Sequence, residues 1–228
     1  MILRLVLPTL LGALVLSPLQ GLAQGGGKVS LQFLSFPKSL DPDPVELLVG
    51  DGKTIEVEIP SSELSQPYKV NAQKVWAVGE STIDEDGKPT FKVWGKAPAL
   101  GAGKPLIILV RKGKSYDDGF ELIPVDGLAN RFGGGSFLFM NAARVDVAGE
   151  VGGEKFALHP GERTIIKPAP LPGRDNITHA TLYYRKGEKP RPFFSSRWPL
   201  HANARSLIFL YHDPKTDRIR LHSIRDFF

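Results

Sequence analysis

Lys104-Pro-Leu-Ile-Ile-Leu-Val-Arg111 carries a pattern that occurs a second time in the chain, in Arg205-Ser-Leu-Ile-Phe-Leu-Tyr-His212. Each holds a short apolar run between polar or basic residues, and this pattern predicts a β-strand that is buried on both faces. At an offset of 101 residues, three apolar positions are identical in the two stretches: Leu106, Ile107 and Leu109, and Leu207, Ile208 and Leu210. The sequence therefore predicts that one kind of buried strand occurs twice.

Further matches surround this pair and keep nearly the same order along the chain. They are Val49-Gly50 with Val151-Gly152, Lys88-Pro89 with Lys189-Pro190, Gly79-Glu80 with Gly187-Glu188, and Phe33–Phe36 with Leu138–Asn141. The matches extend over about 95 residues, which is the size of a domain and much longer than a solenoid repeat. We therefore expect an internal duplication, with a first repeat at residues 28–127 and a second at residues 136–228. Between them, Gly133-Gly134-Gly135 predicts a flexible join.

Composition and turn signals assign both repeats to the all-β class. The 228 residues include 24 glycines and 19 prolines, more than a helical bundle tolerates. Thr54–Ile59 alternates cleanly, with Val57 facing inward and Glu56 outward. Short strands of this kind, separated by turns such as Asp117-Asp118-Gly119, favour a sandwich or a barrel. We expect two tandem antiparallel β-sandwich (Ig-like) domains arising from an internal duplication. The chain has no cysteine, so burial alone must stabilise them.

The N-terminal segment reads as a secretory signal peptide. Arg4 supplies the positive charge, and Leu5–Leu16 forms an apolar run of about twelve residues. Gly21-Leu22-Ala23 places small residues before the expected cleavage site, so residues 1–23 are assigned to the signal peptide. A membrane anchor is the alternative, but it needs roughly 20 apolar residues. We expect the mature chain to be exported, periplasmic or extracellular, without a transmembrane segment.

Charge is divided unevenly between the repeats. Lys28–Gly127 holds 12 basic and 15 acidic residues, whereas Leu128–Phe228 holds 16 basic and 9 acidic residues and all five histidines. Three interpretations remain open. The second repeat binds an anionic partner, such as an anionic polysaccharide or an envelope protein; the acidic repeat packs against the basic one; or the charges are simply solvated. Nucleic acid is disfavoured by export and by the absence of a reading motif.

No motif for catalysis or metal binding stands out. His201, His212 and His222 invite a metal site, but a hairpin through Asp213–Asp217 would place His212 opposite Arg218. His222 would then face Ile208, about 13 Å from His212 and too far to share a cation. Cysteine-based sites and the G-x-S-x-G and H-E-x-x-H motifs do not occur. We therefore assign no catalytic residue, no metal ligand and no cofactor.

The Pro-rich stretch Pro190–Pro199 is the candidate ligand-binding segment. It interleaves two arginines with three aromatic residues: Arg191, Phe193, Phe194, Arg197 and Trp198. Such a mixture can form a surface for sugars, peptides or proteins. The alternative is a loop over the sandwich edge with buried aromatic rings. That alternative is favoured because Trp94 occupies the corresponding stretch of the first repeat.

The chain resembles uncharacterised secreted bacterial proteins with tandem Ig-like β-sandwich domains. The resemblance rests on the signal peptide, the repeated strand pattern and stretches such as Phe156-Ala-Leu-His-Pro-Gly-Glu162. It implies a fold and a compartment but no functional residue. We expect a non-catalytic cell-envelope or extracellular binding protein that uses its basic second repeat. The alternative is an exported hydrolase with a site at the repeat interface or on the second repeat.

Overall fold

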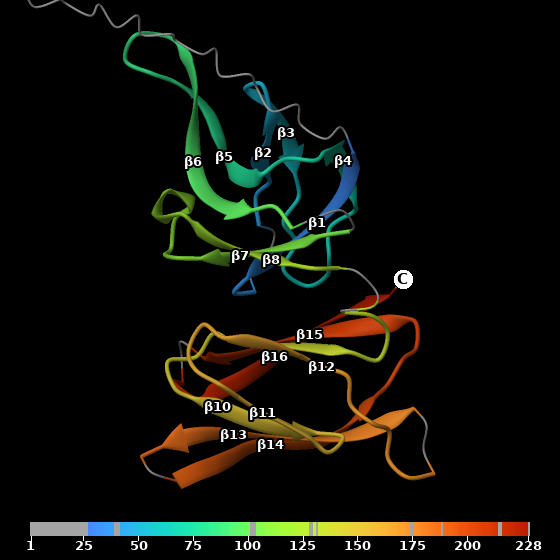
Figure 1. The fold of residues 1–228 in the computed structure, drawn as a ribbon. Helices are drawn as coiled ribbons and strands as arrows, with labels where there is room; N and C mark the ends of the chain where they lie inside the picture. Colours follow the sequence, from blue (N-terminus) through green and yellow to red (C-terminus); the bar gives the residue numbers. More distant parts are fainter. Residues whose placement is uncertain are drawn as a thin grey trace, which may run out of the picture.

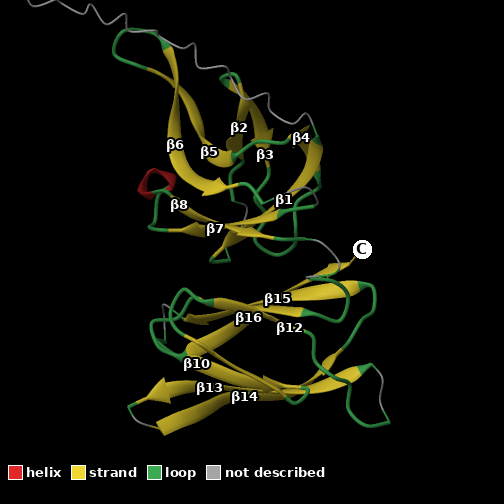
Figure 2. Cartoon of the chain, viewed as in Figure 1, coloured by secondary structure: helices red, strands yellow, loops and turns green. Residues whose placement is uncertain are grey.

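The computed structural model describes residues 27–38, 42–100, 104–127, 130, 132–173, 176–187, 189–213 and 216–227. The predicted signal peptide at residues 1–23 lies outside these ranges. The described chain is built from strands, with one short 3₁₀ turn at Tyr116–Asp118 (Figure 2). No helix among the described residues is long and apolar enough to cross a bilayer. The predicted all-β class is confirmed.

The first sandwich contains eight strands in two four-stranded sheets (Figure 1). Their bounds are β1 (Lys28–Phe36), β2 (Val45–Gly50), β3 (Lys53–Val57), β4 (Tyr68–Asn71), β5 (Val75–Ile83), β6 (Pro89–Pro98), β7 (Leu106–Arg111) and β8 (Phe120–Val125). One sheet has the order β4-β1-β7-β8 and the other has the order β3-β2-β5-β6. The expected alternation holds, because Val57 is fully buried and Glu56 is exposed.

The second sandwich repeats this plan strand by strand. Its bounds are β9 (Phe137–Asn141), β10 (Val147–Val151), β11 (Glu154–Leu158), β12 (Arg163–Ile166), β13 (Ile177–Lys186), β14 (Lys189–Pro199), β15 (Ala204–His212) and β16 (Ile219–Phe227). The sheet orders are β12-β9-β15-β16 and β11-β10-β13-β14. Adding eight to each strand number of the first sandwich gives the second, as an internal duplication predicts.

The expectation of purely antiparallel sheets needs one correction in each repeat. β1 runs parallel to β7, and β9 runs parallel to β15. The first strand of each repeat therefore lies beside the seventh, which is possible because four of the five strands between them form the opposite sheet. Immunoglobulin constant domains instead have the order A-B-E-D in one sheet and C-F-G in the other. The Ig-like expectation therefore does not extend to strand order.

Two of the matched segments are corrected by the structure. Phe33 pairs with Ile107, and Phe139 pairs with Ile208, so Phe33 corresponds to Phe139 rather than to Leu138. An error of one residue in a strand assigns every side chain to the wrong face. The match of Gly79 with Gly187 is also wrong, because Gly79 lies within β5 whereas Gly187 follows β13 in a turn.

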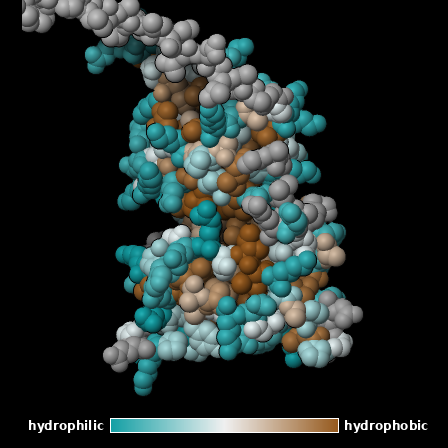
Figure 3. Space-filling model, viewed as in Figure 1, coloured by the Kyte–Doolittle hydropathy of each residue, from teal (hydrophilic) through white to brown (hydrophobic). Residues whose placement is uncertain are grey.

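The two central sheets face each other, and apolar side chains fill the space between them (Figure 3). Ile107 and Leu109 point into the first sandwich, whereas Leu106 and Ile108 point toward the second. The same division holds in β15. The shared cluster consists of Leu34, Phe36, Leu106, Ile108, Ile123 and Val125 from the first repeat, Phe132 from the join, and Leu138, Met140, Leu207, Phe209 and Ile224 from the second. This cluster explains why both strands carry continuous apolar runs.

The two repeats pack against each other, as one of the three charge interpretations expected, and the core of their contact is apolar. The Phe36 ring stacks on Phe209 with ring centroids 4.5 Å apart. The join is also anchored, since its Phe132 is fully buried and the Arg205 guanidinium lies over that ring. Arg205 NH1 donates hydrogen bonds to the Gly127 and Phe132 carbonyl oxygens, both at 3.1 Å. The predicted flexible join is therefore held by the second repeat at these points.

Candidate functional site

The candidate segment Pro190–Pro199 is not a loop but most of the edge strand β14. An edge strand tolerates prolines because one row of its backbone groups has no partner strand. Phe193, Phe194 and Trp198 are half-buried and pack against the core of the second sandwich. Trp198 lies 5.2 Å from the Phe137 ring, measured between ring centroids. The aromatic members of the segment are therefore packing residues, and its arginines are exposed.

The two arginines lie on opposite faces of the sheet. Arg191 is opposite Tyr184, which packs toward the sandwich core. Arg197 is opposite His179, which lines a groove on the outer face. A register shift between Leu182 and Tyr183 changes the phase of β14 between the two arginines. Arg191 and Arg197 therefore do not form one site, and only Arg197 belongs to the outer face.

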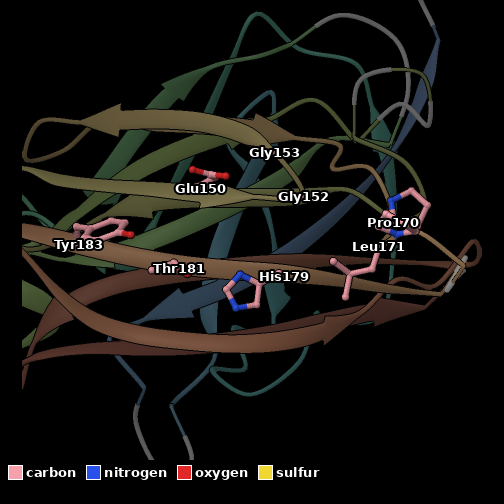
Figure 4. A pocket seen from close by; sticks show the side chains of 9 residues that line it. Glu150, Gly152, Gly153, Pro170, Leu171, His179, Thr181 and Tyr183 are labelled. Atoms are coloured by element: carbon pink, nitrogen blue, oxygen red, sulfur yellow. The ribbon is translucent and has the colours of Figure 1, made fainter.

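The outer face of the second sandwich carries a groove of about 490 Å³ (Figure 4). His179, Thr181 and Tyr183 alternate along β13, and Glu150 lies beside them on β10. They share this face because every second residue of a strand points the same way. The rest of the lining is Gly152, Gly153, Pro170, Leu171 and Pro172. The groove thus combines hydroxyl, imidazole and carboxylate groups with a few apolar contacts.

Ser195 on β14 extends this polar row. Its Oγ lies 3.4 Å from His179 Nε2 and 3.3 Å from Thr181 Oγ1. These groups can both donate and accept hydrogen bonds, the property needed to bind a hydroxyl-rich ligand. Among the described residues, no carboxylate is hydrogen-bonded to the His179 ring. The arrangement therefore shows a serine near a histidine without the third group that orients the base in a triad.

A second groove, of about 230 Å³, adjoins the first, and Tyr183 lines both. Its lining is otherwise mostly apolar, with Val147, Ala148, Ala157, Leu158, Tyr184 and Pro190. Three ionisable residues complete the lining: Asp146, His159 and Arg185. His159 Nδ1 lies 2.9 Å from Asp146 Oδ1, and Arg185 NH1 lies 3.4 Å from Asp146 Oδ2. The hydrogen bond to Asp146 raises the pKa of His159 above its ordinary value.

The first sandwich does not reproduce this face. Val78 and Leu182 occupy equivalent positions, because each pairs with the middle of the neighbouring strand and each precedes a register shift in its hairpin. Counting from them, three polar residues of β13 correspond to three nonpolar residues of β5: His179 to Val75, Thr181 to Ala77 and Tyr183 to Gly79. A side chain cannot be added freely at Gly79, since its Cβ would lie 2.0 Å from the Lys92 carbonyl oxygen.

The sequence contained a signal for the polar row. Ala180, Leu182 and Tyr184 mark the inward face of a strand, so the residues between them must point outward. The row was missed because an alternating polar face is also what any solvated strand shows. Glu150 and Ser195 lie on other strands, and only the sheet pairing brings them near His179.

The histidines considered as metal ligands are not brought together. His212 pairs with Ile219 rather than Arg218, and His222 pairs with Phe209 rather than Ile208. The predicted hairpin was therefore one residue out of register. His222 lies at the contact between the repeats, where its Nε2 is 3.3 Å from the Ser61 carbonyl oxygen. No three His, Asp or Glu side chains of the described residues gather closely enough to hold a metal ion.

Comparison of the chain with protein-family models and with curated proteins found no match.

Proposed function

We propose that this chain is an exported cell-envelope binding protein, and that the outer face of its second sandwich binds an anionic polysaccharide. The observation that carries the proposal is the polar row His179, Thr181 and Tyr183 on β13, which lines the groove, whereas the equivalent residues of the first sandwich, Val75, Ala77 and Gly79, are nonpolar. The row is specific to one of two otherwise equivalent sheets. Two of the equivalent first-sandwich residues, Ala77 and Gly79, are buried, whereas His179 is exposed and Thr181 and Tyr183 are half-buried.

The groove has the chemistry that a sugar requires. Sugar hydroxyls both donate and accept hydrogen bonds, and the Thr181, Tyr183 and Ser195 hydroxyls can do the same. Glu150 adds an acceptor beside them. The Tyr183 ring supplies a flat apolar surface with a polar tip, which suits a ligand that is apolar on one side and hydroxylated at its edges. At about 490 Å³, the groove falls within the size range of small-ligand sites.

Charge favours an acidic polymer over a neutral one. Arg197 is exposed and lies opposite His179 on the outer face, and a guanidinium can bind a carboxylate through two hydrogen bonds. The equivalent sheet of the first sandwich presents the cross-strand pair Glu46 and Glu56 instead. Two carboxylates there repel an anion, so the polymer would concentrate on the second sandwich.

The compartment is inferred from the sequence alone. Residues 1–23 have the three regions of a signal peptide, and the chain resembles secreted bacterial proteins with tandem Ig-like domains. Export would bring the second sandwich into contact with envelope polysaccharides. Periplasmic and extracellular locations are both consistent with this inference.

The second candidate function is an exported hydrolase on the same face, favoured by the 3.4 Å approach of Ser195 Oγ to His179 Nε2. Apolar side chains fill the contact between the repeats, so we place the hydrolase alternative on the second repeat. Ester turnover that disappears in Ser195→Ala would support it. Polymer binding that survives Ser195→Ala without turnover would support the binding protein.

The proposal is tested by titrating the full chain with polygalacturonate, with neutral dextran as the control polymer. Binding should weaken between roughly 0.1 M and 1 M salt, as the Debye length falls from about 10 Å to 3 Å. Arg197→Glu should reduce the affinity about tenfold or more. The matched control is Lys96→Glu, an exposed residue of β6 at the position equivalent to Ser195, and it should change the affinity little. Equal losses in both variants, or binding only to an acidic protein, would overturn the polysaccharide assignment.

A further inference from the structure

The second groove, floored by alanines, has no assigned role in the binding described so far. We propose that it is a subsite for an acyl substituent, such as an acetyl group, so that the preferred ligand is an acylated anionic polysaccharide. This inference rests on the proposed function, because it concerns a second part of the same ligand.

The floor of the groove is made of small side chains that the first sandwich lacks. Ala148 and Ala157 are direct cross-strand partners on β10 and β11. Their equivalents are Glu46 and Glu56, which are direct partners on β2 and β3. Replacing two glutamates by two alanines removes two charges and leaves space above the sheet. The pair of small side chains is thus specific to the sandwich that we propose binds the polymer.

The size and lining of the groove suit a small apolar group rather than a whole ligand. Its volume of about 230 Å³ is below the roughly 300–1,000 Å³ of typical small-molecule sites. The apolar side chains of Ala148, Ala157 and Pro190 line it beside Tyr183. A methyl group gains free energy when it leaves water for such a lining. An unsubstituted sugar ring, covered with hydroxyls, would gain less there.

The rim can recognise the carbonyl oxygen of an acyl group. His159 uses Nδ1 for its contact with Asp146, 2.9 Å away. The hydrogen bond to Asp146 raises the pKa of His159 and so favours the protonated ring, in which Nε2 is a second N–H donor. The acid of the rim is already engaged by both His159 and Arg185. An acyl carbonyl can accept a hydrogen bond from this Nε2 N–H, whereas a free ammonium group would find the only acid of the described rim already engaged.

The two grooves lie in line along one strand. Tyr183 lines both, with His179 in the first and Arg185 in the second. Residues 179 and 185 are separated by about 20 Å along β13, at roughly 3.3 Å per residue. That length fits several units of a linear polymer. A polymer that follows β13 would place its hydroxyls and carboxylates at the first groove and an acyl substituent at the second.

The test compares acetylated polygalacturonate with the same polymer after deacetylation, each titrated into the full chain. The wild-type protein should bind the acetylated form about tenfold more tightly. Ala157→Trp places a large side chain in the second groove and should abolish this preference, while the affinity for the deacetylated form stays within about twofold of wild type. Ala157→Leu is the milder variant, and it should reduce the preference partly.

The matched control is Glu56→Trp, at the equivalent position of the first sandwich, which should leave the preference intact. Thermal unfolding of each variant checks that the sandwich has folded. Equal binding of both polymers by the wild-type protein would overturn the acyl subsite while leaving the proposed function standing. A preference that persists in both Ala157 variants would overturn it as well. Binding of neither polymer would be a failure of the proposed function itself.

Discussion

The outer sheets of the two sandwiches share a strand order and differ in what they present to solvent. The orders β3-β2-β5-β6 and β11-β10-β13-β14 correspond, and each hairpin carries a register shift at the equivalent place, after Val78 and after Leu182. On the outer face, however, Glu46 and Glu56 of the first sandwich are replaced by Ala148 and Ala157. The backbone plan has been kept while the exposed chemistry has changed.

The buried apolar positions of the two central sheets, in contrast, are the same in both sandwiches. Ile107 and Ile208 occupy equivalent positions, and each is almost fully buried in the core of its own sandwich. Leu106 and Leu207 both point into the cluster between the sandwiches. A duplicated sheet must keep its apolar positions to remain packed, whereas its solvent-facing positions can change at little cost in stability. Differences between equivalent outward residues are therefore where a gained function is expected.

The largest expected effect on stability comes from a substitution at the start of the central strand, where two equivalent residues differ in burial. Arg205 and Lys104 occupy equivalent positions, but the Arg205 side chain is buried and its Nε donates to Asp226 Oδ2 at 2.7 Å, whereas Lys104 is exposed. Arg205→Ala leaves a nearly buried carboxylate without this partner, so it should reduce the free energy of unfolding by about 3–5 kcal/mol. Lys104→Ala should cost about 0.5 kcal/mol or less. Chemical denaturation measures both values.

The double variant Arg205→Ala with Asp226→Ala supplies the control for that prediction. It should be more stable than Arg205→Ala alone, because the unpaired carboxylate is removed as well. Similar losses for Arg205→Ala and Lys104→Ala would show that the buried ion pair is not what distinguishes the two positions.

The next largest effect on stability separates substitutions of buried residues from a substitution on an outward face. Ile208 is 2% exposed, and Ile208→Ala should reduce the free energy of unfolding by about 2–5 kcal/mol, through lost burial and the cavity that remains. Its equivalent Ile107 is fully buried, so Ile107→Ala should fall in the same range. Glu56→Ala, on an outer face, should cost about 0.5 kcal/mol or less. Chemical denaturation of the three variants under one condition measures these losses. Equal losses at Ile208 and Glu56 would contradict the assignment of Ile208 to a buried face and Glu56 to an outward face.

The smallest effect is the pH dependence contributed by the His159–Asp146 contact. Because the folded-state pKa of His159 is raised, its contribution to stability is fully present below the unfolded-state pKa. That contribution is lost as the pH rises through the folded-state value. The stability difference between wild type and Asp146→Asn should therefore be larger at about pH 5 than at about pH 9.

An NMR titration checks the cause directly, since Asp146→Asn should lower the pKa of His159. The control His159→Gln should remove the pH-dependent part of the difference. A difference that is the same at both pH values would mean that Asp146 acts through Arg185, 3.4 Å away, and not through His159.

The sequence predicted the fold better than the site, for a physical reason. Burial leaves a strong pattern, so Leu106–Val110 was correctly predicted to be covered on both faces. The pattern could not say that the second cover is the other sandwich, because apolar residues do not identify their partners. Register was predicted less well, as the shift from Leu138 to Phe139 shows, since one residue of error is invisible in a short apolar run.

The groove residues come from strands that only the sheet pairing brings together. Glu150, Thr181 and Ser195 lie on β10, β13 and β14, and nothing in their spacing along the chain indicates that they are neighbours. The segment chosen from sequence, Pro190–Pro199, contributes Arg197 to the outer face, but its aromatic residues pack against the core. The mixture of arginines and aromatic residues was visible in the sequence, whereas the face that each one occupies was not.

The outer face of the second sandwich is expected to bind the anionic polymer, and that of the first is not. The most direct test exchanges the equivalent floor residues in the full chain and measures the affinity for polygalacturonate by titration calorimetry. Ala148→Glu with Ala157→Glu gives the second sandwich the two glutamates of the first, and it should weaken binding about tenfold or more. Glu46→Ala with Glu56→Ala should change the affinity by less than about twofold. Undiminished binding by the first variant, or an equal loss in both, would contradict the account.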